Sequence, residues 1–367
     1  MHLTSTYRNN RHQGETTLPR VLVLKAGSAA GNNLIRSLKA GDPGLSIVGC
    51  HDDPFVLKKS EAAGNHVVGS SPRAFLRDLK RIVKREAVDL VIPTNDMDVL
   101  ALAELGREVP CRTFLPRLAT IRRCQDKYSL TMHLRRRGLP APLTFPLNSV
   151  NDIDRVFMRF APGSKLWCRV RSGTGSFAAL PVVRADQVRS WIDYWEEMRG
   201  VPPGSFTLSE YLPGRDFCVQ SLWNNGQLVL TKMAERITYI DGGSPSGVSS
   251  TPALAKTAYE QHVVDVCERA IKSIDQRASG VFFLDIKEAV DGRACITEIN
   301  AGRFATITNI HDLSGEHNMA RLYVRLALDE PVRLRRASDY AEDYFLVRSV
   351  DTVPALFHGR ELFAQAN

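Results

Sequence analysis

The sequence lacks the long apolar segments that cross membranes. No run of residues approaches the roughly 18–20 consecutive apolar residues that span a bilayer, and the N-terminus has no apolar signal core. Cysteine is also sparse. The seven cysteines are scattered and form no C-x-x-C pair of the kind that binds zinc or carries redox chemistry. We therefore expect a cytoplasmic protein with reduced cysteines and no membrane partner.

The composition indicates a multidomain protein with a basic surface. The 367 residues are 44% hydrophobic and 24% charged, which predicts two or three domains with sizeable cores. The net charge is +8, but the positive residues are spread along the chain and no stacking aromatics are interleaved with them. A nucleic-acid partner is therefore disfavoured, and the charge is expected on solvated helix faces, where it would also attract anionic substrates such as nucleotides.

The N-terminal third has the pattern of a parallel sheet. Residues 1–19 are polar and are predicted to be a disordered leader. From Arg20 to about residue 118, short apolar runs alternate with amphipathic helices, which indicates parallel strands with covering helices. The turn from Gly27 to Gly31 does not fit G-x-G-x-x-G, so we interpret it as a packing turn and keep an NAD-linked oxidoreductase as the alternative.

The rest of the chain mixes helices with hairpins. A helix is predicted for Ile121–Gly138, and Asn225-Gly226 predicts a hairpin turn. The other expected elements are helices at Val150–Phe160, 258–274 and 316–328, strands at Lys165–Val170 and Phe206–Leu212, a second hairpin at 281–300, and a tail from Arg333 that returns as a strand.

The last hairpin carries the clearest chemical signal. If Asp291-Gly292 forms a two-residue turn, Val290 faces Arg293 and Asp285 faces Glu298. Asn300 shares that face because strand side chains alternate with a period of two. Opposed carboxylates destabilise a sheet unless a cation neutralises them, and hard oxygen ligands favour Mg²⁺. A solvated face, with Lys287 paired to either carboxylate, explains the hairpin equally well.

Two upstream segments could bind a nucleotide. Arg169 and Arg171 flank the start of a loop of small residues, whose backbone N–H groups could cover phosphates; these residues include Ser172, Gly173, Gly175 and Ser176. The strand end at Glu210, Tyr211 and Leu212 could contact an adenine edge, with Asp216 holding ribose hydroxyls. An ordinary turn and an ordinary acidic loop are the alternatives.

Taken in order, these segments resemble the ATP-grasp superfamily from about Arg20 to about Pro331. The similarity is carried by the helix with Asp126-Lys127, the cationic strand before the Gly/Ser loop, the Glu210-Tyr-Leu segment and Glu298-Ile-Asn300. It is strongest to the carbamoyl phosphate synthetase-like, carboxylate–amine ligase branch. The resemblance implies an α/β fold: a Rossmann-like pre-ATP-grasp domain (20–118), a two-subdomain ATP-grasp domain (119–332, with a lid at about 140–208), and a tail (333–367) that packs on the core.

The resemblance also implies residue roles. Lys127 and Arg169 would contact ATP phosphates, and Arg169 stands where many members have lysine. The adenine hinge would be formed by Glu210, Tyr211 and Leu212, the ribose contact by Asp216, and the ligand set for one or two Mg²⁺ ions, with Mn²⁺ as an alternative, by Asp285, Glu298 and Asn300. Arg236 would face the γ-phosphate or acyl phosphate, with an exposed strand arginine as its alternative. Arg303 would be the second catalytic cation, but one inserted residue before it puts its contact in question.

The activity implied by the resemblance is ATP-dependent ligation. A carboxylate would be phosphorylated to an acyl phosphate and captured by an amine, with release of ADP and phosphate. The partners would be small-molecule carboxylate and amine substrates, with a homodimer left open and no nucleic acid. A bicarbonate-phosphorylating enzyme and a non-catalytic Mg-ATP-binding module remain alternatives. Acceptor pockets in such enzymes draw on loops here at Tyr239–Ser250 and Arg303–His311.

Overall fold

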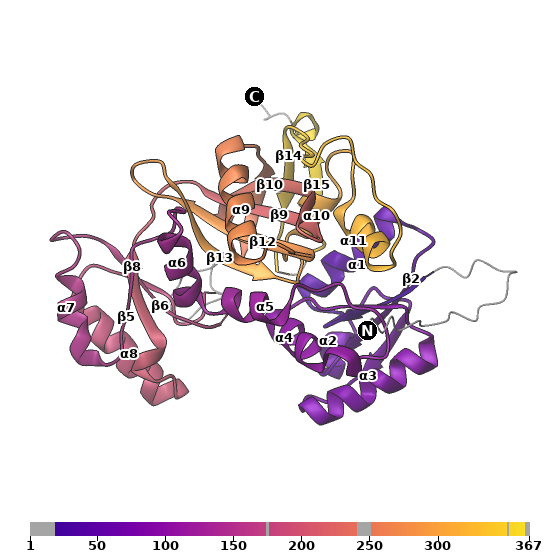
Figure 1. The fold of residues 1–367 in the computed structure, drawn as a ribbon, viewed down its shortest axis with the longest axis horizontal. Helices are drawn as coiled ribbons and strands as arrows, with labels where there is room; N and C mark the ends of the chain where they lie inside the picture. The colour runs from indigo at the N-terminus through magenta and orange to yellow at the C-terminus, as the bar shows by residue number, and fades with distance from the viewer. Residues whose placement is uncertain (1–18, 174–175, 241–250, 351, 364–367) are drawn as a thin grey trace, which may run out of the picture.

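The fold is built on three β-sheets. The computed structural model describes residues 19–173, 176–240, 251–350 and 352–363, so the predicted leader, apart from Pro19, lies outside the described residues. In Figure 1 the seven-stranded sheet occupies the upper centre, the N-terminal sheet and its helices lie on one side, and the small four-stranded sheet with α7 and α8 lies on the other. No helix in the described ranges is long and apolar enough to span a membrane.

The N-terminal sheet is parallel, as predicted, with the order β3-β2-β1-β4. Gly27 has φ +88°, and a Cβ there would lie 2.1 Å from the carbonyl oxygen of Val56. A Cβ at Gly31 would lie 2.4 Å from the carbonyl oxygen of Lys25, so both glycines serve close packing of the turn and helix. The elements are β1 (Arg20–Leu24), α1 (Ala29–Gly41), β2 (Ser46–His51), α2 (Pro54–Leu57), β3 (Gly64–Val67), α3 (Pro72–Glu86), β4 (Leu90–Ile92), α4 (Asp96–Leu105) and η1 (Gly106–Glu108).

The predicted helix at Ile121–Gly138 is wrong in its continuity, because two helices occupy this segment. α5 (Leu118–Gln125) ends where Asp126 becomes extended, and α6 (Lys127–Arg136) begins immediately after it. The Asp126 carboxylate accepts a hydrogen bond from the Ser129 N–H, so it caps α6. The break places Lys127 in the first turn of α6, where its side chain is buried.

The small sheet is antiparallel, with the order β5-β8-β6-β7 and its own hydrophobic core. The helix predicted at Val150–Phe160 is confirmed only as far as Phe157, as a short 3₁₀ turn followed by α7. The elements of this part are β5 (Thr144–Pro146), η2 (Val150–Asp152), α7 (Ile153–Phe157), β6 (Leu166–Val170), β7 (Leu180–Val182), α8 (Ala185–Arg199), η3 (Pro203–Ser205) and β8 (Phe206–Glu210).

The seven-stranded sheet has the order β13-β12-β9-β10-β11-β14-β15. The predicted hairpin at Asn225-Gly226 is confirmed, and the tail returns to the sheet as β14 and β15, as expected. The elements are β9 (Asp216–Asn224), β10 (Gln227–Tyr239), β11 (Pro252–Thr257), α9 (Gln261–Ile274), β12 (Gly280–Glu288), β13 (Ala294–Ala301), α10 (Thr308–Asp312), α11 (Met319–Ala327), β14 (Tyr344–Val347), β15 (Ala355–His358) and η4 (Gly359–Glu361).

A shared hydrophobic core joins the N-terminal sheet to the seven-stranded sheet. Leu34 and Ile35 of α1 belong to the same buried cluster as Met319 and Tyr323 of α11 and Leu222 of β9. These side chains are almost fully inaccessible to solvent. Because apolar burial of this kind is the main stabilising term in folding, this shared core holds the two sheets against each other.

Candidate active site

The β12–β13 hairpin places Asp285 opposite Glu298, as predicted. The turn is longer than predicted. The Ala289 N–H donates to the Arg293 carbonyl, and the Ala289 carbonyl accepts from the Gly292 N–H. Val290 therefore does not face Arg293. The ladder pairs Asp285 with Glu298 but Ile286 with Ile296, so Thr297 is an extra residue on β13. This β-bulge compensates for the longer turn, and the carboxylates therefore still oppose each other.

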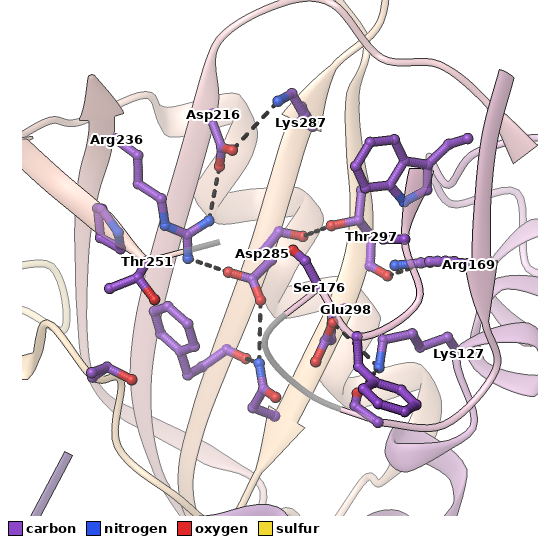
Figure 2. A pocket seen from close by; sticks show the side chains of 18 of the residues that line it. Lys127, Arg169, Ser176, Asp216, Arg236, Thr251, Asp285, Lys287, Thr297 and Glu298 are labelled. Atoms are coloured by element: carbon purple, nitrogen blue, oxygen red, sulfur yellow. Dashed lines mark hydrogen bonds and ion pairs between the residues drawn. The ribbon is translucent and has the colours of Figure 1, made fainter. Parts of the chain in front are cut away.

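The predicted metal-binding side chains lie together on this face. The Asn300 amide donates to the Asp285 carboxylate at 3.3 Å and to the Phe283 carbonyl at 3.4 Å. Asn300 is buried, while the side chains of Asp285 and Glu298 are each 21% exposed. The three oxygen-bearing side chains therefore converge at a partly open site. Figure 2 shows its two carboxylates, Asp285 and Glu298, at the centre of the view.

Glu298 is paired with Lys127 across the break between α5 and α6. The Lys127 ammonium lies 3.5 Å from the Glu298 carboxylate and also donates to the carbonyl of Gly173. Burial raises the pKa of Glu298, and the positive charge of Lys127 acts in the opposite direction. Lys127 thus links the carboxylate to the start of the loop of small residues.

Arg236 neutralises the other carboxylate. Its guanidinium donates to Asp285 and, at 2.9 Å, to Asp216. Burial acts to lower the pKa of Arg236, but the neighbouring negative charges of Asp285 and Asp216 prevail and raise it. Asp216 also accepts from the Tyr239 hydroxyl and lies 3.6 Å from the Lys287 ammonium (Figure 2). The alternative of an exposed strand arginine is therefore wrong, because the Arg236 side chain is only 9% exposed.

Arg169 approaches the site from the small sheet. It is buried on β6 and donates from Nη2 to the carbonyl of Thr297, the bulged residue, at 3.0 Å. Its Nε is enclosed without a hydrogen-bond partner among the described residues, and burial lowers the pKa of Arg169. In the adjacent loop, Gly173 and Ser176 line the cavity, Ser172 is exposed, and Gly175 lies outside the described residues.

The predicted adenine hinge also reaches the cavity. The Glu210 carboxylate accepts from the backbone N–H of Leu143 at 2.8 Å, which fixes the end of β8. Leu212 is buried against Ala289 and Cys295, whereas Tyr211 has the Lys165 ammonium 4.2 Å from its ring centre. All three hinge residues line the cavity.

Arg303 contacts a carboxylate of the N-terminal region. Its guanidinium forms a two-pronged ion pair with Asp96, with N–O distances of 2.6 and 3.3 Å, and also donates to the Asn300 side chain. Both charged side chains are largely buried. Arg303 therefore contacts Asp96 and, through Asn300, supports the carboxylate site.

These side chains surround a single cavity of about 620 Å³. The cavity lies between the small sheet and the seven-stranded sheet and reaches the carboxyl end of β4, and its volume is typical of a small-molecule site. Every predicted site residue lines it except Ser172, which is exposed, and Gly175, which lies outside the described residues. The lining comprises Lys127, Arg169, Gly173, Ser176, Glu210, Tyr211, Leu212, Asp216, Arg236, Asp285, Glu298, Asn300 and Arg303, among others.

Several cavity residues were missed by sequence reasoning. Asp96 follows β4, and side chains at the carboxyl ends of parallel strands commonly meet a ligand, so its position after an apolar run was an available signal. Trp167 and Phe283 are apolar lining residues whose sequence neighbourhoods look like ordinary core. Tyr239, named only as the start of an acceptor loop, contacts Asp216 directly.

The donor set fits a magnesium ion. Asp285, Glu298 and Asn300 offer hard oxygen atoms, and Mg²⁺ usually completes its shell with water and phosphate oxygens. In the described residues, no group of three or more His, Cys, Asp or Glu side chains surrounds one point, so an ion here would have two carboxylates and an amide. The cations Lys127 and Arg236 neutralise these carboxylates in the structure itself.

The fold is shared with several solved structures. An L-amino acid ligase from Bacillus licheniformis superposes with a TM-score of 0.65 at 11% identity, covering 89% of this chain and 78% of that one. The biotin carboxylase domain of 2-oxoglutarate carboxylase from Hydrogenobacter thermophilus, in complex with MgADP, ADP and bicarbonate, has a TM-score of 0.69 at 15% identity and covers 91% and 74%.

A third neighbour is N5-carboxyaminoimidazole synthase from Aspergillus clavatus, in complex with ADP and 5-aminoimidazole ribonucleotide. Its TM-score is 0.65 at 18% identity, with 90% of this chain and 82% of that one covered. No family model matches the sequence, and no curated protein matches it. At these low identities the structural likeness concerns the fold: this chain has the ATP-grasp fold that the resemblance implied.

Proposed function

We propose that this protein is a Mg-ATP-dependent ligase that joins a carboxylate to an amine. The observation that supports this most directly is the convergence of Asp285, Glu298 and Asn300 beside Lys127 and Arg236 in one cavity. Oxygen ligands next to cations match the needs of a metal-bound triphosphate. The three structural neighbours named above, an amino acid ligase, a biotin carboxylase domain and a carboxyaminoimidazole synthase, support the same class of reaction.

In this proposal, the carboxylate oxygen of the acceptor attacks the γ-phosphorus and the bond from that phosphorus to the β-phosphate oxygen breaks, which releases ADP. The amine then attacks the acyl carbon, phosphate leaves, and the amine proton passes to solvent. Magnesium would supply charge neutralisation for the phosphate oxygens. Arg236 and Lys127 would hold the negative charge that develops on the transferred phosphoryl group, and positioning would provide much of the rate.

The adenine and ribose would lie along β8 and β9. Glu210, Tyr211 and Leu212 form the wall of the cavity there, and Arg169 and Ser176 would close over the phosphates from the small sheet. Asp216 is the proposed ribose contact, although Arg236, Tyr239 and Lys287 already surround its carboxylate. A ribose hydroxyl would therefore join an existing network there.

The proposal places the enzyme in the cytoplasm with small-molecule substrates, and a homodimer is to be tested by its size in solution. A bicarbonate-phosphorylating enzyme is the second candidate, because one structural neighbour is described with bound bicarbonate. An ADP-release screen separates the two, since it compares bicarbonate with amino acids and other small carboxylic acids, each with and without an amine. Mn²⁺ replaces Mg²⁺ in parallel reactions.

We expect Glu298→Gln to abolish substrate-dependent ADP release while leaving the protein folded. The substitution removes one carboxylate from the proposed metal site and leaves Lys127 without its partner. Glu268→Gln is the matched control, because Glu268 pairs with Lys272 on the surface of α9. Circular dichroism checks folding, and coupled-enzyme detection of ADP measures turnover. Full activity in Glu298→Gln would remove the metal assignment, and Mg-ATP binding without any turnover would favour a non-catalytic module.

A further inference from the structure

The turn from Ser176 to Ala179 has a strained backbone. It leads into β7, and the Ala179 N–H donates to the Ser176 carbonyl at 3.0 Å. Ser176 has φ +58° and Ala178 has φ +51°, a left-handed conformation that residues other than glycine seldom adopt. Such strain persists only where neighbouring contacts hold the backbone in place, and it is common at ligand sites. The turn therefore depends on side chains that pack against it.

Aromatic side chains of α8 hold this turn. Trp191 donates from Nε1 to the carbonyl of Ala178 at 3.1 Å. The Phe177 ring packs edge-on against Trp195, with ring centres 4.5 Å apart, and Trp195 packs against Trp191 at 5.6 Å. Trp195 is buried in the hydrophobic core of the small sheet. The Phe177 ring is therefore anchored to the body of this part of the fold.

The same turn faces the active-site cavity. Ser176, Phe177 and Ala179 all line the cavity. Phe177 is 45% exposed even though its ring packs on Trp195, so a ligand can still cover part of its surface. A large apolar side chain that is left partly uncovered in a cavity is a common feature of ligand sites.

Contacts with Gly173 place the Phe177 ring at one end of the cavity. A Cβ added at Gly173 would lie 3.6 Å from Cδ1 of Phe177 and 3.7 Å from the Val170 side chain, so the ring rests beside Gly173. The Gly173 carbonyl accepts from the Lys127 ammonium, which lies 3.5 Å from the Glu298 carboxylate. Phe177 is therefore at the end of the cavity where the proposed metal and phosphates would bind, with Val170 as an apolar neighbour.

We propose that Phe177 covers the phosphate end of the nucleotide site and keeps water from the γ-phosphate and the acyl phosphate, with Trp191 as the residue that positions it. This proposal rests on the ligase function proposed above. When water attacks the γ-phosphorus, the bond to the β-phosphate oxygen breaks, ADP leaves and a proton passes to solvent, so ATP is consumed without product. Attack by water on the acyl carbon likewise releases phosphate and regenerates the carboxylate. A phenyl ring occupies space there and offers water no hydrogen-bonding group, which disfavours both side reactions.

The test compares attack by water with the complete reaction. ADP release is measured with Mg-ATP alone, where water is the only nucleophile, and with the carboxylic acid and amine that the ADP-release screen identifies. We expect Phe177→Ala to raise the rate with Mg-ATP alone by about threefold or more relative to the complete reaction, because water reaches the phosphates. Phe177→Leu keeps an apolar side chain there and should stay near the wild type. Phe55→Ala is the control, since Phe55 is 84% exposed on α2, and circular dichroism checks that each variant is folded.

Trp191→Phe tests the positioning role. The substitution removes the N–H that donates to Ala178 and keeps an aromatic ring beside Trp195. We expect the ratio of the two rates to shift in the same direction as in Phe177→Ala, but less. Calorimetry should show the Mg²⁺ complex of a non-hydrolysable ATP analogue bound about two- to tenfold more weakly, with adenosine binding unchanged, since one hydrogen bond that holds the turn is lost. Tyr194→Phe is the control on the same helix, where Tyr194 is 39% exposed, and it should change neither measurement.

The outcomes separate this proposal from the proposed function. If Phe177→Ala leaves the ratio of the two rates at the wild-type value, the ring only packs against α8 and the covering role is wrong, while normal ADP release with both substrates leaves the ligase function standing. A wild-type ratio and wild-type affinity in Trp191→Phe would remove the positioning role. If no acid and amine stimulate ADP release in the wild type, the ligase function is wrong. The covering role then stands if Phe177→Ala still raises ADP release from Mg-ATP alone, and it is overturned if that rate does not rise.

Discussion

At the β12–β13 end of the cavity Asp285 and Glu298 have counter-charges within contact distance, whereas the buried Arg348, which follows β14, has none among the described residues. Asp285 contacts Arg236, and Glu298 contacts Lys127. The difference is between buried charges that the protein itself compensates and a buried charge that it does not compensate. At the first end, ion pairs within the protein hold the side chains in place, and a metal-bound nucleotide would replace some of these contacts when it binds. Arg348 is a buried cation that no acidic group among the described residues compensates, which costs stability.

The strongest test of the paired end removes Arg236. We expect Arg236→Met to reduce ADP release by about 10²–10³-fold, because Asp285 and Asp216 lose their shared cation and the proposed phosphoryl contact is lost. Arg215→Met is the matched control, since Arg215 pairs with Glu235 and Glu260 at the surface. Steady-state ADP release at saturating ATP measures the effect. Near-normal turnover in Arg236→Met would mean that charge pairing at this end serves stability alone.

A smaller effect is expected from the contact between Arg303 and Asp96. Asp96→Asn and Arg303→Met should each lower ADP release by about tenfold, because Arg303 holds the Asn300 side chain. In urea unfolding, the double-mutant cycle should give a coupling energy of about 1–3 kcal/mol, as expected for directly contacting residues. Additive effects would instead indicate that the two residues act independently.

The smallest effect concerns Asp312, a buried group with an unpartnered oxygen among the described residues. Burial raises the pKa of Asp312 from 3.8 to about 6, against the lowering effect of hydrogen bonds from Thr308 and Ser37. Between these values the unfolded chain loses the proton while the folded chain keeps it, so stability falls as the pH rises. Asp312→Asn should remove this dependence and raise the thermal midpoint at pH 7 by on the order of 2 °C.

The Asp312 test sharpens the comparison because Asp312 packs against α1 rather than lining the cavity. Its substitution should leave nucleotide binding and substrate-dependent ADP release unchanged. Thermal unfolding at pH 4 and pH 7 gives the stability difference, which should be much smaller at pH 4, where the wild-type carboxyl is protonated. A change in ligand affinity would show that unpartnered buried groups at this face act together.

Features set by local pattern were predictable from the sequence. The parallel N-terminal sheet follows from alternating apolar runs and amphipathic helices, and the opposition of Asp285 and Glu298 follows from strand periodicity around a turn. The prediction of a two-residue turn was wrong, yet the pairing was right, because the Thr297 bulge offsets the longer loop. A bulge has no reliable signature in a single sequence.

Features set by distant contacts were not predictable. The Asp126 carboxylate at the break forms an ion pair with Arg171, which is 45 residues away. The position of Arg303 depends on Asp96, which is 207 residues away in sequence. Arg348 lies in a tail whose strand pairing is decided by the sheet edge that β11 presents. In each case the sequence shows an ordinary charged residue, and only the folded arrangement shows its partner or the lack of one.

The single bulged residue in β13, Thr297, offsets the longer turn of this hairpin. Deleting Thr297 would leave Glu298 opposite Asp285, because Ile286 already pairs with Ile296, but it would remove the bulge whose carbonyl accepts a hydrogen bond from Arg169. By contrast, the tip can vary at Val290, which is 88% exposed, whereas Gly292 has φ +77° and favours glycine. Peptide tags or reporter labels introduced by substitution are therefore best placed at the tip, where the ladder beneath them is unaffected.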